Sequence, residues 1–129
     1  MIKKYFHITA KEVPIFKGKL VIVLTNDVDN VKKYLPNWED DYVYGHTWKY
    51  SYKNRQGYYL ILNLWNTDME ITHGVIAHEA VHVAQFVTER AGIRDDECTA
   101  YITEWATDQV YRYLDKMSMT KLLSIKGKL

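Results

Sequence analysis

Two histidines and a glutamate in the segment His78-Glu79-Ala80-Val81-His82 have the types and spacing of a catalytic zinc site. Successive residues of an α-helix are about 100° apart, so the histidines lie only about 40° apart on one face. Both imidazoles can therefore reach one ion, and zinc accepts nitrogen ligands at roughly 2.0 to 2.1 Å while a catalytic site keeps one position for water. Glu79 lies about 100° round from His78, and we predict that it takes a proton from metal-activated water as general base.

The residues around the motif predict a helix that begins between Thr67 and Thr72 and ends near Ala91. Thr67 with Glu70 resembles a capping box, and Thr72 is a rival cap. Gly92 suits the left-handed position that follows a helix end. The helix is apolar almost all round, which predicts a core helix. One arc of this helix carries His78, Glu79, His82 and Gln85. Burying the ionisable groups among them costs free energy unless they are paired or bound to metal.

A second helix is predicted from Asp95 or Asp96 to about Met117, and it carries the candidates for a third metal ligand. Glu97 lies in its first turn, and Glu104 lies on the same helical stripe. If the two helices form a tight antiparallel hairpin, Glu104 is nearer the level of the histidines and Glu97 is roughly one turn short. Side-chain reach can close that gap, so geometry leaves both candidates open.

The motif followed by Glu97-Cys98-Thr99-Ala100 resembles the gluzincin branch of zinc metallopeptidases, several families of which carry Glu-x-x-Ala-Asp. The resemblance implies that Glu97 is the third ligand, and it favours Glu97 over Glu104. It also implies a Zn²⁺ cofactor, hydrolysis of peptide bonds in a peptide or protein substrate, and a minimal zincin fold. Tyr101 stands where those families have aspartate. The stretch 72–105 is also similar to small zincin-like proteins of phages and gut bacteria, which covers about a quarter of the chain.

Three further residues are candidates for roles at or near the site. Tyr101 lies one turn after Glu97 and could stabilise the oxyanion of an acyl-transfer reaction. His46 lies in an aromatic segment, where an ordinary strand histidine is the favoured interpretation over an electrophile. His73 points away from the arc of the motif and is expected to help form the helix start.

The amino-terminal half of the chain predicts β-structure. Strands are expected at 2–8 and 20–25, with a short helix at 28–35 between them and the next strand. The segments 42–52 and 58–65 flank a polar connection at 53–57 of hairpin length. Together these elements predict one α+β domain over residues 1–129, with an antiparallel sheet of three or four strands on the motif helix and the second helix completing the metal site. In zincins an extended substrate lies against the edge strand, expected here at 60–65 or its hairpin partner.

Size and composition exclude several classes of protein. The chain has 129 residues, with 17 Lys and Arg against 16 Asp and Glu. A formal charge of +1 gives no electrostatic footprint for nucleic acid or an anionic membrane. No apolar run is long enough for a signal peptide or a membrane span, which predicts a cytoplasmic protein. Cys98 is the single cysteine, so an internal disulfide cannot form.

Two other functions fit the same residues. In a non-catalytic interaction protein, such as one encoded by a phage, the metal would only pin the two helices together, and Glu79 would have no role. In a metal-dependent amidase the site residues would be the same and only the pocket would differ. The sequence specifies no oligomeric state.

Overall fold

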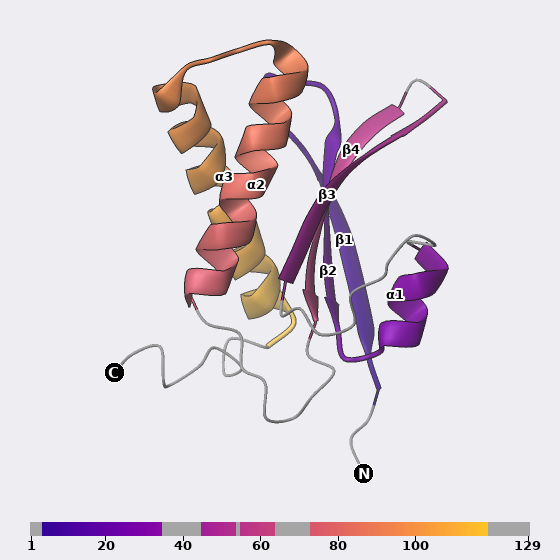
Figure 1. The fold of residues 1–129 in the computed structure, drawn as a ribbon. Coiled ribbons are helices and arrows are strands. Elements are labelled where there is room, and N and C mark those ends of the chain that lie inside the picture. Colours follow the sequence, from indigo (N-terminus) through magenta and orange to yellow (C-terminus); the bar gives the residue numbers. More distant parts are fainter. Residues whose placement is uncertain (1–3, 35–44, 54, 64–72, 119–129) are drawn as a thin grey trace.

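A mixed four-stranded sheet with helices on both faces forms the described part of the chain (Figure 1). The computed structural model describes residues 4–34, 45–53, 55–63 and 73–118. The elements, in chain order, are β1 (Phe6–Glu12), β2 (Lys19–Thr25), α1 (Val28–Tyr34), β3 (Gly45–Tyr52), β4 (Arg55–Asn63), α2 (His73–Ala91) and α3 (Asp96–Lys116). The predicted α+β class is confirmed.

The strand order in the sheet is β1-β2-β4-β3. The pairs β1/β2 and β3/β4 are antiparallel, whereas β2 and β4 are parallel, so the pairing is mixed and not wholly antiparallel as expected. A parallel pair needs a long crossover between its strands, and α1 and β3 lie in the chain between β2 and β4. Hairpin spacing in the sequence reveals the antiparallel neighbours but not this crossover.

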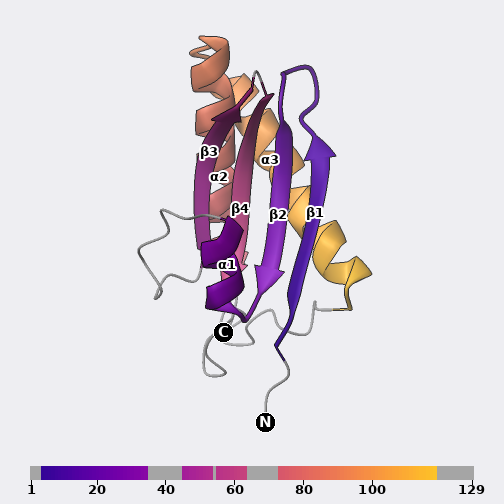
Figure 2. The same ribbon diagram turned by 90° about the vertical axis from the view of Figure 1, so that its right-hand side faces the viewer.

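The two inner strands, β2 and β4, are buried or half-buried on both faces along most of their length. Even-numbered apolar residues of these strands pack with α2 and α3, and odd-numbered ones pack toward α1. Figure 2 shows α1 in front of the sheet and α2 and α3 behind it. Strands covered on both sides have continuous apolar runs instead of alternation, as in Leu60-Ile61-Leu62. The expected edge at 60–65 is therefore an inner strand as far as it is described, and its hairpin partner β3 is the edge.

Helices α2 and α3 lie side by side and antiparallel on one face of the sheet (Figure 1). At their connection Gly92 adopts the predicted left-handed conformation, with φ of 69°, and the Ile93 amide donates to the Thr88 carbonyl at 2.9 Å. Asp95 caps α3 by accepting hydrogen bonds from the amides of Glu97 and Cys98. At the opposite end His73 contacts Tyr111 through a ring stack and a hydrogen bond.

Some boundaries differ from the prediction. The first strand runs to Glu12, beyond the expected 2–8, and β4 begins at Arg55, which makes the hairpin turn shorter than 53–57. The candidate caps Thr67, Glu70 and Thr72 lie outside the described residues. Among the helices that the structure describes, none is long and apolar enough to cross a membrane.

One side of α2 is buried and the other is exposed. Two valines, one on each side, allow the contribution of this burial to stability to be compared. Val83 is fully buried, whereas Val81 is 38% exposed. Since burying a valine side chain stabilises by roughly 1.5 to 3 kcal/mol, Val83→Ala should lower the free energy of unfolding by about 2 kcal/mol more than Val81→Ala. Urea denaturation of both variants checks this. Equal effects would mean that α2 does not pack on the sheet through this face.

Candidate metal centre

The two motif histidines lie together on the surface of α2. The Nε2 atom of His82 is 3.1 Å from the Nε2 atom of His78, and the ring centroids are 4.7 Å apart. Two nitrogens that are each about 2.05 Å from one tetrahedral ion are about 3.3 Å apart. His78 is exposed and His82 is half-buried. The pair therefore has the separation and the access to solvent that a shared ion needs.

Gln85 sets the orientation of one of these rings. Its Oε1 atom lies 3.1 Å from Nδ1 of His82, and because an amide oxygen can only accept, Nδ1 must donate. A neutral imidazole protonated on Nδ1 has its lone pair on Nε2, the atom that faces His78. A hydrogen bond of this kind on the remote ring nitrogen is the usual support of a metal-ligating histidine.

Glu79 lies on the side of α2 that faces the sheet, next to the edge strand. Its side chain is only 6% exposed. Thr47 on β3 donates its hydroxyl to Glu79 Oε1 at 2.7 Å and also lies 3.2 Å from the Glu79 carbonyl oxygen. The predicted base is thus a buried carboxylate, next to His78 in the sequence, with a hydrogen bond to one oxygen.

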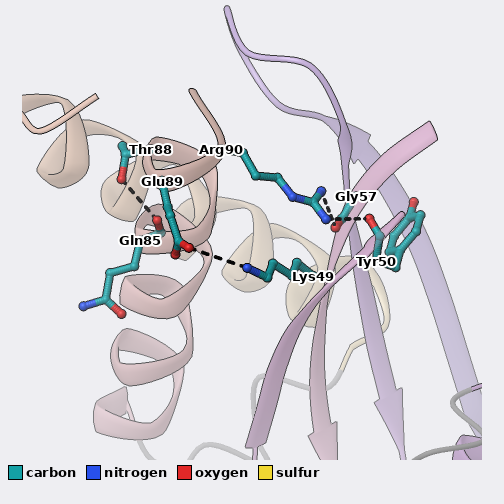
Figure 3. Close-up of polar contacts among 7 residues, drawn as sticks. All are labelled: Lys49, Tyr50, Gly57, Gln85, Thr88, Glu89 and Arg90. Atoms are coloured by element: carbon teal, nitrogen blue, oxygen red, sulfur yellow. Dashed lines mark hydrogen bonds and ion pairs between the residues drawn. The ribbon is translucent and has the colours of Figure 1, made fainter. Parts of the chain in front are cut away.

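Side chains from the second half of α2 hold this helix against the β3–β4 hairpin (Figure 3). Arg90 donates to the carbonyl oxygens of Tyr50, at 2.9 Å, and Gly57, at 3.4 Å. Lys49 forms an ion pair with Glu89 at 3.6 Å. These contacts join the motif helix to both strands of the hairpin, which fixes the distance between Glu79 and β3.

The predicted third ligands lie on α3, away from the histidines. Within the described ranges, no three His, Cys, Asp or Glu side chains are close enough to share an ion. Glu97 and Glu104 are both exposed, on the side of α3 opposite its buried residues Ile102, Ala106 and Val110. His82 is nine residues from His73, and Glu97 is 14 residues from Tyr111, which contacts His73. At about 1.5 Å per residue, Glu97 therefore lies about 7.5 Å further along the helix pair than His82.

Tyr101, His46 and His73 also lie away from the histidine pair. Tyr101 is 55% exposed on the same outer side of α3. His46 is next to Thr47 on β3, and strand alternation directs it to the opposite face of the sheet, in register with Ile61. His73 contacts Tyr111, as stated above, and burial raises the pKa of the Tyr111 hydroxyl above its ordinary value, so this hydroxyl stays protonated at neutral pH.

Gly45, Thr47 and Gln85 are parts of the site whose roles the sequence analysis did not find. A glycine inside a strand can mark the close approach of another group, so the sequence does contain a signal for Gly45. Thr47 has no such signal, because a threonine in a strand is ordinary. Gln85 was placed on the arc of the motif, but its contact with His82 depends on the rotamers of both side chains.

An open hollow of about 1050 Å³ lies on the opposite face of the sheet, where Lys17, Tyr50, Arg55 and Tyr59 are among its lining residues. None of the motif residues lines it. The histidine pair is instead an exposed surface site beside the β3 edge, which suits an extended substrate better than a small enclosed one.

Comparisons with protein-family models, with curated proteins and with solved structures found no match. The interpretation of the site therefore rests on its own residues and on the motif resemblance.

Proposed function

We propose that the protein is a zinc-dependent hydrolase that cleaves peptide bonds, with His78 and His82 as metal ligands and Glu79 as general base. The observation that carries this proposal is the convergence of the two Nε2 atoms, 3.1 Å apart, on the helix that also carries the buried carboxylate of Glu79. Two neutral imidazoles without an ion would gain only one weak hydrogen bond from this arrangement. A shared cation uses both lone pairs.

The donor set fits zinc in type. Imidazole nitrogen is a preferred zinc ligand, and the contact between Gln85 and His82 leaves the correct nitrogen free to coordinate. The ion would act as a Lewis acid on a carbonyl and lower the pKa of water.

The chain's own residues account for the proton transfers. Glu79 would accept a proton from the attacking water on Oε2, the oxygen that Thr47 does not hold, and later donate it to the leaving nitrogen. Its buried position keeps bulk water from competing for the carboxylate. Tyr101 would have to move from its present position on α3 to stabilise the oxyanion, so that role stays a prediction.

The sheet edge supports a peptide as the substrate. β3 is an end strand of the sheet, so one side of its backbone pairs with no other strand in the described part of the chain. An extended peptide can add to such an edge through main-chain hydrogen bonds. Trp48 on this strand is 54% exposed and contacts Phe86 of α2 edge to face, which offers an apolar surface beside the histidines.

The third ligand is tested by comparing Glu97→Gln with Glu104→Gln. On the gluzincin resemblance, Glu97→Gln should weaken zinc binding by about tenfold or more, the order found when groups that support a zinc site are removed. Glu104→Gln should bind zinc like the wild type. Competition with a fluorescent zinc chelator measures both. Since Glu97 lies away from the histidines, the expected result would imply that the first turn of α3 shifts when zinc binds; no loss in either variant would remove both glutamates from the ligand set.

The function itself is tested in two steps on protein purified without a metal-affinity tag. Elemental mass spectrometry should find close to one zinc per chain, and a library of quenched fluorescent peptides should reveal cleavage that a chelator abolishes. Zinc without cleavage of peptides would favour the non-catalytic interaction protein or an amidase with another substrate. Absence of zinc after incubation with the metal at neutral pH would contradict the proposal.

A further inference from the structure

Two residues of the edge strand β3 lie against the side chain of Glu79. We propose that Gly45 and Thr47 of the edge strand form a seat that fixes the carboxylate of Glu79 beside the histidine pair, with Thr47 as a positioning residue. This inference rests on the proposed function for its catalytic consequence. The contacts that make up the seat are those of the described residues and can be tested separately.

Glu79 is a charged group in a buried position. Glu79 and Thr47 are each only 6% exposed, and the neighbouring buried positions of α2, Ile76, Ala80 and Val83, are apolar. Burying a carboxylate is unfavourable unless hydrogen bonds compensate for the lost water. An apolar residue at position 79 would pack against the sheet without that cost, so stability alone does not explain Glu79.

A short hydrogen bond joins the hydroxyl of Thr47 to the carboxylate of Glu79. A distance of 2.7 Å between Thr47 Oγ1 and Glu79 Oε1 is within the range of a charge-assisted bond. Thr47 is held in register with Leu60 of the inner strand β4. Its β-branched side chain has restricted rotamers, which makes it a rigid donor. The bond therefore fixes one carboxylate oxygen relative to the sheet.

The side chain of Glu79 occupies the space next to Gly45 that a Cβ atom would need. A Cβ atom at this position would lie 2.8 Å from Cγ and 3.2 Å from Oε2 of Glu79. Contacts of 2.8 Å between carbon atoms are too close, so any other residue would push the carboxylate away. The φ angle of Gly45 is not in the left-handed region, so the backbone conformation does not demand glycine. Glycine is needed at this position because the side chain of Glu79 fills the space that a Cβ atom would occupy.

Together these contacts leave one oxygen available. Oε1 accepts from Thr47, whereas Oε2 accepts no hydrogen bond from another residue in the described segments. Oε2 is thus the carboxylate oxygen that remains to accept a proton from water.

The test uses variants of the full chain at the seat and a matched threonine outside it. Thr47→Val removes the hydroxyl and keeps the shape, Thr47→Ser keeps the hydroxyl, and Gly45→Ala adds the Cβ atom. Thr88→Val is the control, because Thr88 is equally buried on α2 but bonds to the backbone carbonyls of Ala84 and Gln85. Peptide hydrolysis and zinc content are measured for each.

A displaced catalytic group can cost on the order of 100-fold in rate, so kcat should fall by roughly 10- to 100-fold in Thr47→Val and Gly45→Ala. KM and zinc content should stay near wild-type values, because neither substrate nor metal contacts change. Thr47→Ser should recover most of the lost rate, and Thr88→Val should leave kcat unchanged. An unchanged kcat in Thr47→Val, or a serine variant as slow as the valine variant, would overturn the inference.

A second measurement separates failure of the seat from failure of the proposed function. In a double-mutant cycle of Thr47→Val with Glu79→Ala, followed by urea denaturation without substrate, the combined shift in midpoint should be smaller than the sum of the single shifts. The cycle of Thr88→Val with Glu79→Ala should be additive. Additivity in the first cycle overturns the seat. Coupling there, in a wild type that cleaves no substrate, supports the seat and rejects the hydrolase.

Discussion

Glu79→Gln is expected to lower kcat/KM for peptide cleavage by about 10²- to 10⁴-fold, the range for removal of a general acid–base group. Glutamine has nearly the same shape as glutamate, and its Oε1 atom can still accept the Thr47 hydroxyl, which now lies 2.7 Å from the carboxylate. The amide cannot take a proton from water. Steady-state assays on a peptide that the wild type cleaves give the comparison.

The control for this variant is Glu89→Gln on the same helix. Glu89 is exposed and pairs with Lys49, away from the histidines, so its replacement should leave cleavage within about twofold and stability within about 0.5 kcal/mol of the wild type. Glu79→Gln should keep its zinc and its fold by circular dichroism. If Glu79→Gln remains fully active, Glu79 is not the base.

His82→Ala is expected to reduce zinc from close to one ion per chain to nearly none. Two histidine nitrogens make up the identified donor set, and the Gln85 amide only orients one of the rings. A single imidazole on a surface helix cannot hold zinc tightly. Elemental mass spectrometry after gel filtration measures the content. His78→Ala should give the same result, because the two Nε2 atoms converge.

The matched control is His73→Ala, since His73 is also an exposed histidine of α2 but contacts Tyr111 of α3. It should retain zinc and lose only some stability at that end of the helix pair. Equal loss of zinc in His73→Ala and His82→Ala would indicate unfolding of α2 and not removal of a ligand. If His82→Ala keeps its zinc, the ion binds elsewhere, and the histidine pair has only a structural role.

Local sequence determined the helical hairpin and the histidine pair. The helical period alone places His78 and His82 on one face and groups Ile76, Ala80, Val83 and Val87 on another, and these four are buried in the structure. Gly92 and Asp95 define the turn through conformational freedom and a side-chain cap, both of which act over a few residues. Signals of this kind depend on neighbours in the chain, so they can be recognised without knowing the fold.

Tertiary structure decided which strand is the edge and what surrounds Glu79. The parallel pairing of β2 with β4 moves β3 to the edge, and that pairing depends on contacts between residues far apart in the chain. Thr47 and Gly45 meet Glu79 only because of this arrangement. The predicted stripe of Glu97, Tyr101 and Glu104 is a stripe on α3, but the rotation of that helix turns it toward solvent. A helical period shows which residues share a face, whereas the direction of that face depends on where the apolar side of the helix packs.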